Sequence, residues 1–178
     1  FQSHWSNETQ LTLLKNIKNR WPQMYKELIA DVRRAFYALC THIDAQIRLV
    51  IGTLREEKLL DNTIIMITSD HGDMLGDFGL FAKRLMYENS ARVPMILLGT
   101  KEDKIVDRGK VSNRLVGLAD IMPTLLTLCK IKIPSSCDGQ NMLDNKPREF
   151  LYAEANEGVN ATRMVTNNNF KLVWYPYG

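Results

Sequence analysis

The sequence predicts an α/β fold: helices flank part of a mixed or parallel sheet, and a small antiparallel hairpin follows near the C-terminus. One long stretch carries apolar residues at every third or fourth position, which is typical of an amphipathic helix. Two short runs, within residues 63–68 and 93–98, are apolar at consecutive positions, as in strands that are covered on both faces. The 178 residues, 45% of them hydrophobic, suffice for one core.

The helix is the clearest element. Pro22 stands where a first-turn proline is favoured, and Asp61 and Asn62 are expected to break the helix. Charged side chains fall mostly off the apolar stripe, so one face of the helix is predicted to pack against a core. The stripe consists of Leu28, Val32, Phe36, Leu39, Ile43, Ile47, Val50 and Leu54.

Further elements are expected in the second half of the chain. Residues 118–130 read as a helix, and residues 134–139 form a turn cluster. Residues 151–155 are a short strand candidate. Residues 163–165 and 170–174 surround three consecutive asparagines and read as a hairpin.

Charge and cysteine content narrow the range of partners. The net charge of +3 is small and its lysines and arginines are scattered, so we expect no nucleic-acid partner. No apolar run is long enough to span a bilayer, and no signal peptide is visible. Cys40, Cys129 and Cys137 match neither a metal-binding spacing nor an even disulfide set, and we interpret them as structural thiols. The cellular compartment is left open.

Candidate metal ligands follow the first apolar strand. Asp70 and His71 stand at its carboxyl end, where α/β sheets bind ligands. Neighbouring residues on a regular strand point to opposite faces, but Gly72 would let the backbone turn so that both side chains converge. An aspartate oxygen beside a histidine nitrogen accepts a hard or borderline divalent cation. Alternatively, Asp70 caps the turn and His71 is a hydrogen-bonded core residue.

Lys83 is a candidate for binding an anion. It follows a Gly-rich loop and lies among apolar residues. Its ammonium group is suited to contact an anionic substrate, although a lysine in such a place often extends to the surface instead. Arg84 competes for the same role, and Tyr87, Glu88 and Arg92 could support the site or simply be solvated.

These motifs, taken in order, resemble the sulfatase family of the alkaline-phosphatase-like superfamily. Residues 69–77 (SDHGDMLGD), 79–83 (GLFAK) and 92–96 (RVPMI) carry the resemblance. Two later segments agree with it: residues 118–126 (LADIMPTLL) resemble the family's D-x-x-P-T-L-L helix, and residues 137–143 (CDGQNML) resemble its D-G-x-S-L turn.

The resemblance implies roles for three residues. Asp70 and His71 match ligands of a divalent cation, usually calcium in this family, with magnesium as the alternative. Lys83 matches the lysine that contacts the sulfate group. The implied reaction is hydrolysis of a sulfate monoester, carried by a small molecule or a carbohydrate, in which metal and lysine offset charge in the transition state.

One expected part of the site is missing. Sulfatases carry a formylglycine nucleophile within a C/S-x-P-x-R motif, and this motif does not occur in the 178 residues. We therefore expect residues 1–178 to be a single partial domain, the C-terminal portion of a sulfatase catalytic domain, with residues 1–21 as a weakly patterned lead-in. Such a piece alone is expected to be inactive, and an exposed sheet edge would favour self-association.

Two alternatives belong to other functional classes. A phosphonate monoester hydrolase or phosphodiesterase of the same superfamily would share the Asp70–His71 pair and Lys83. A non-catalytic fragment, kept for binding or scaffolding, would need neither the nucleophile nor the remaining ligands.

Overall fold

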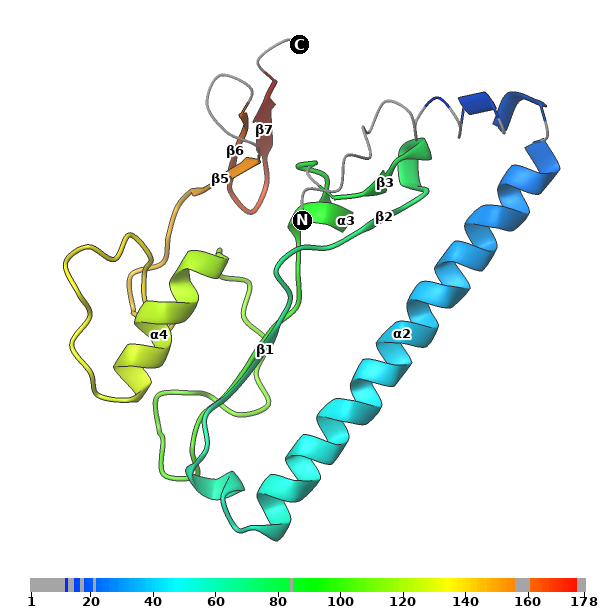
Figure 1. Ribbon diagram of the computed structural model, residues 1–178. Helices are drawn as coiled ribbons and strands as arrows, with labels where there is room; N and C mark the ends of the chain where they lie inside the picture. The colour runs from blue at the N-terminus through cyan, green and yellow to red at the C-terminus, as the bar shows by residue number, and fades with distance from the viewer. Residues whose placement is uncertain are drawn as a thin grey trace. The chain divides into compact units, whose positions relative to one another are not determined.

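A long helix dominates the N-terminal half of the computed structural model, which describes residues 12, 15–16, 18–20, 22–83, 85–155 and 161–175. Helix α2 spans Pro22–Glu56 and is drawn as one continuous helix in Figure 1. Its start at Pro22 is the predicted one. Its end lies earlier than predicted, because Lys58 adopts a left-handed conformation with φ of 60° and donates its amide to the Arg55 carbonyl.

The predicted strands are present, and their pairing is antiparallel. Strand β1 (Ile65–Thr68) pairs with β4 (Met95–Leu98), with Ile65 opposite Leu98. Each residue of β1 is half-buried, whereas β4 alternates between half-buried and exposed positions. All the pairs among the described strands are antiparallel, and β1 and β4 form a two-stranded sheet.

The C-terminal sheet is larger than the predicted hairpin. Strands β6 (Thr162–Thr166) and β7 (Lys171–Trp174) form that hairpin, and β5 (Leu151–Ala155) adds a third antiparallel strand beside β6. The sequence predicted β5 as an isolated strand. The alternation of apolar and polar residues does not by itself indicate which strand pairs with it.

Shorter elements connect these parts. The second helix, predicted over residues 118–130, begins as a short 3-10 turn that ends at Asp120. The α-helix that follows is α4 (Ile121–Leu128). The remaining elements are η1 (Leu60–Asn62), β2 (Met74–Leu75), η2 (Asp77–Gly79), β3 (Phe81–Ala82), α3 (Glu88–Ala91) and η3 (Leu118–Asp120). No helix in the described ranges is both long and apolar enough to cross a membrane.

The chain separates into two units. The first comprises residues 1–54 and 73–82, and the second comprises residues 55–72 and 83–178. In the first unit, Arg33 of α2 donates to the Leu75 carbonyl at 2.9 Å and pairs with Asp77 at 3.0 Å. Tyr25 and Met74 are the buried apolar side chains that the structure describes there.

Candidate active site

Asp70, His71 and Lys83 all belong to the second unit, and their polar atoms meet. The carboxylate oxygen Oδ2 of Asp70 lies 3.3 Å from Nε2 of His71. The ammonium nitrogen Nζ of Lys83 lies 2.6 Å from the same ring nitrogen. The alternation expected of a regular strand therefore does not hold here, because β1 ends at Thr68 and the side chains of Asp70 and His71 converge beyond it.

The hydrogen bonds of His71 indicate its tautomer. Nδ1 lies 2.8 Å from the carbonyl oxygen of Gly72, and only a protonated ring nitrogen can donate to a carbonyl. In the tautomer that carries its proton on Nδ1, Nε2 is an acceptor, and Lys83 donates to it. A histidine whose Nδ1 is held by a backbone carbonyl presents Nε2 in the way that metal-binding histidines do.

Asp70 is largely solvated, with 81% of its side chain exposed, compared with 35% for His71. The pKa of Asp70 is lowered from its ordinary value. Partial desolvation opposes this shift, but the hydrogen bond from the His71 amide, the electrostatic interaction with the His71 side chain and, to a smaller extent, the charge of Lys83 outweigh it. The carboxylate therefore stays ionised, as a cation ligand must be.

Asp70 and His71 together fit a divalent cation, which would take the place of the Lys83 ammonium at Nε2 of His71. Two acceptor atoms, one carboxylate oxygen and one imidazole nitrogen, lie within 3.3 Å of each other and already face a positive group, the Lys83 ammonium. Oxygen with imidazole nitrogen is a donor set for hard or borderline ions. No cluster of three or more His, Cys, Asp or Glu side chains suited to a metal occurs in the described ranges. A closed site would need further ligands.

Gly72 is required for a reason other than the predicted one. Its φ is not in the left-handed region. Instead, its amide donates to the Ser90 carbonyl at 2.8 Å, and a Cβ atom at this position would lie 2.0 Å from the carbonyl oxygen of Asn89. Glycine therefore lets the loop that carries Asp70 and His71 pack directly against the backbone of α3.

The other candidates have different outcomes. Arg84 lies outside the described residues. Glu88 contacts Lys171, and Arg92 lies 3.9 Å from Glu88 with 82% of its side chain exposed. Cys40, Cys129 and Cys137 are free thiols, but Cys40 and Cys129 are exposed and Cys137 is half-buried, so they are not the buried structural thiols expected from the sequence.

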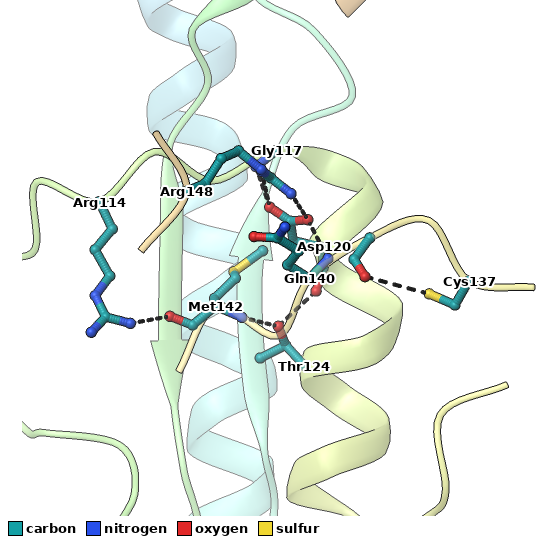
Figure 2. A network of polar contacts seen from close by, with 9 residues as sticks. Arg114, Gly117, Asp120, Thr124, Cys137, Gln140, Met142 and Arg148 are labelled. Atoms are coloured by element: carbon teal, nitrogen blue, oxygen red, sulfur yellow. Dashed lines mark hydrogen bonds and ion pairs between the residues drawn. The ribbon is translucent and has the colours of Figure 1, made fainter. Parts of the chain in front are cut away.

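A second polar cluster surrounds Asp120, which is 2% exposed (Figure 2). Arg148 binds both of its carboxylate oxygens, at 2.6 and 2.7 Å. The amides of Gly117 and Gln140 each donate to it at 2.8 Å. Four donors satisfy the acceptor capacity of a carboxylate, so this cluster is structural and offers nothing to a ligand. The sequence did not indicate this role of Arg148, since the residue lies in a charged loop without a motif.

The comparisons with known proteins agree with the motifs. A sequence model of the sulfatase family, described as Sulfatase, matches residues 2–131. An arylsulfatase of Clostridium perfringens (strain 13 / Type A) is 35% identical over 156 residues, which are 84% of this chain and 32% of that protein. Human arylsulfatase K is 33% identical over 133 residues, covering 75% of this chain and 24% of that protein.

Solved structures share the fold of this chain. A protein in complex with its substrate D-glucosamine-2-N,6-O-disulfate is 25% identical, with a TM-score of 0.71 over 90% of this chain and 38% of that one. The phosphonate monoester hydrolase of Agrobacterium radiobacter has a TM-score of 0.73 at 20% identity over 83% of this chain and 34% of that one, a likeness of fold alone. The α/β fold class is confirmed. The chain spans about a quarter to a third of the length of the curated relatives named above.

Proposed function

Because the chain belongs to the sulfatase family, we propose that it contributes the metal-binding and sulfate-binding residues of a site that hydrolyses a sulfate monoester. The convergence of Asp70, His71 and Lys83 within the matched segment carries this proposal. Residues 1–178 form a single partial domain within such an enzyme, with residues 1–21 as a lead-in.

In this reaction the S–O bond of the ester breaks, and water supplies the oxygen that completes the sulfate. Asp70 and His71 bind a divalent cation, calcium in the first place and magnesium as the alternative, which would polarise the oxygens on sulfur when bound. Lys83 donates to a sulfate oxygen and offsets the negative charge that develops on it. The ammonium group suits this task because it is a compact charge with three donors.

The nucleophile comes from outside the described site. Sulfatases commonly use a metal ion together with formylglycine. That residue would supply the attacking group, and no C/S-x-P-x-R motif that would produce it occurs in this sequence. The residues of this chain therefore bind and orient the substrate, and the attacking group is supplied from elsewhere.

The substrate class is a sulfate ester of a small molecule or a carbohydrate. The structural relative that binds a doubly sulfated glucosamine supports this class, and the arylsulfatase relatives support aryl esters as convenient probes. The open position of the site agrees with a ligand that projects beyond it, because Asp70 is mostly exposed.

The experiment compares 4-nitrophenyl sulfate, 4-nitrophenyl phosphate and phenyl phosphonate esters as substrates of the natural full-length protein. The proposal predicts that the sulfate ester is turned over with the highest kcat/KM and that chelation abolishes turnover. Preference for the phosphonate ester would instead establish the hydrolase alternative of the same superfamily. Absence of turnover with every ester, in protein that binds calcium and is folded, would favour a non-catalytic role.

A further inference from the structure

Lys171 occupies an unusual place on the C-terminal sheet. Strand β7 alternates between half-buried and exposed residues, and Lys171 is on the half-buried side, with 24% of its side chain exposed. The register pairs Lys171 with Thr166 and Val173 with Met164, which is buried. Lys171 is the only charged residue among the described strand positions on this face of β5, β6 and β7. Burying part of an ammonium group costs free energy unless it is paired.

The ammonium group has two partners on one distant segment. It donates to the backbone carbonyl of Met86 at 2.9 Å and forms a short ion pair with the carboxylate of Glu88. Met86 is buried, at 4% exposure, so its carbonyl has little access to water. A charged donor is a strong partner for such a carbonyl. Lys171 therefore fixes the segment that leads into α3.

Both parts of the candidate active site are attached to that segment. Met86 follows Lys83 by three positions, so the same short stretch carries the proposed sulfate-binding lysine. On its other side, α3 begins at Glu88, and the carbonyl of Ser90 accepts the amide of Gly72 at 2.8 Å. Gly72 in turn accepts the Nδ1 proton of His71.

These hydrogen bonds and ion pairs form a continuous series within the second unit of the chain. It runs from Lys171 through residues 86–88 to α3, then to Gly72 and the ring of His71. Helix α3 has only four residues, and a helix this short is not stable by itself. Its position against Gly72 must therefore depend on the contacts made by its flanks.

We propose that Lys171 is a positioning residue for the site formed by Asp70, His71 and Lys83: by holding residues 86–88 it keeps α3 against Gly72 and sets the spacing of the metal ligands and the sulfate-binding lysine. The inference deepens the function proposed above and rests on it for its catalytic consequence. The geometric consequence, the dependence of the Gly72–Ser90 hydrogen bond on Lys171, can be tested without any ester.

The test replaces Lys171 in the natural full-length protein. Lys171→Met removes the charge and the donors but keeps an unbranched chain, and Lys171→Arg restores donors that can reach both partners. Lys132→Met is the matched control, because Lys132 is exposed and lies apart from this sequence of contacts. Two quantities are measured: peptide-resolved amide hydrogen exchange over residues 69–75, and calcium affinity by calorimetry.

Lys171→Met should accelerate exchange in the peptide that contains Gly72 and weaken calcium binding by about tenfold, the lower end of the effect of losing an outer partner of a metal ligand. Lys171→Arg should recover most of both, and Lys132→Met should change neither. If Lys171→Met does not fold, Glu88→Lys provides the decision, because Glu88 is 58% exposed and the new charge repels Lys171.

The positioning role would be overturned if hydrogen exchange at residues 69–75 were unchanged in folded Lys171→Met. If that variant does not fold, unchanged exchange in Glu88→Lys would overturn it instead. Failure of the proposed function looks different. If the wild-type protein neither binds calcium nor turns over an ester while exchange still responds to Lys171, the chemistry is wrong and the structural coupling is right.

Discussion

Gly139 and Ala119 approach so closely that a Cβ atom on Gly139 would lie 2.0 Å from the carbonyl oxygen of Ala119. The contact joins the turn after α4 to the residue just before Asp120. It also places the neighbouring amide, that of Gln140, within 2.8 Å of the Asp120 carboxylate. The glycine of this D-G turn is therefore required for a steric reason.

Gly139→Ala is expected to destabilise the fold by about 1–3 kcal/mol or more, because the clash is with backbone that cannot rotate away. Chemical denaturation measures the free energy of unfolding. Gly52→Ala is the matched control: Gly52 lies within α2 and a Cβ there meets nothing within 4 Å. That change should stabilise the helix by about 0.5–1 kcal/mol. Equal effects of the two substitutions would contradict the steric argument.

The pair Asp120–Arg148 should make stability depend on pH. Burial raises the pKa of Asp120, but the hydrogen bonds from Arg148 and from the amides of Gln140 and Gly117 outweigh it, and the net direction is downward. A carboxyl group with a lowered folded-state pKa contributes stability above its unfolded pKa, about 3.9, and loses it as the pH falls through the folded value.

The measurement is the free energy of unfolding of wild type and Arg148→Met from pH 7 down to pH 2. At pH 7 the variant should be less stable by about 3 kcal/mol, because a buried carboxylate loses its partner. The difference should shrink below about pH 4, where Asp120 of the unfolded chain becomes protonated. A difference that stays constant over the whole range would show that packing of the arginine, not its charge, is what matters.

Lys83→Met should lower kcat for a sulfate ester by about a hundredfold to a thousandfold, the usual effect of removing one charge-stabilising donor. Calcium affinity should not fall, because the substitution removes a positive charge beside the ligand atoms of Asp70 and His71. Lys83→Arg should recover activity only in part, since a guanidinium differs from an ammonium in shape and reach. Loss of calcium binding in Lys83→Met would place Lys83 in a structural role.

Much of this fold could be predicted from the sequence because its signals are local. The helix from Pro22 follows from a periodic stripe, and β1 and β4 follow from consecutive apolar residues. The pairing direction of β1 with β4 could not be predicted in this way, because direction depends on the path of the chain between the strands and not on their composition.

The site was predictable in its residue types but not in its supports. Asp70, His71 and Lys83, which are proposed to carry the chemistry, stand in recognisable order. Lys171 contacts residues 83 and 85 positions away, and Arg148, which belongs to the separate cluster around Asp120, contacts a residue 28 positions away. Nothing in the sequence beside either residue indicates those partners. Gly72 was identified correctly as necessary, but its reason is the approach of Asn89, a relationship that only the folded chain reveals.

Gly72→Ala provides the most direct test of how the metal ligands are held. A methyl group at this position collides with the Asn89 carbonyl, and the collision should break the hydrogen bond from Gly72 to Ser90 and shift the ring of His71. We expect calcium affinity to fall by about tenfold to a hundredfold, as when the outer support of a metal ligand is lost.

Asp70→Asn, which keeps the side-chain shape but removes the charge, should weaken calcium binding through the ligand itself. Amide hydrogen exchange of α3 distinguishes the two variants. Gly72→Ala should accelerate this exchange, whereas Asp70→Asn should leave it unchanged. If Gly72→Ala binds calcium like the wild type, the close approach to Asn89 does not set the geometry of Asp70 and His71.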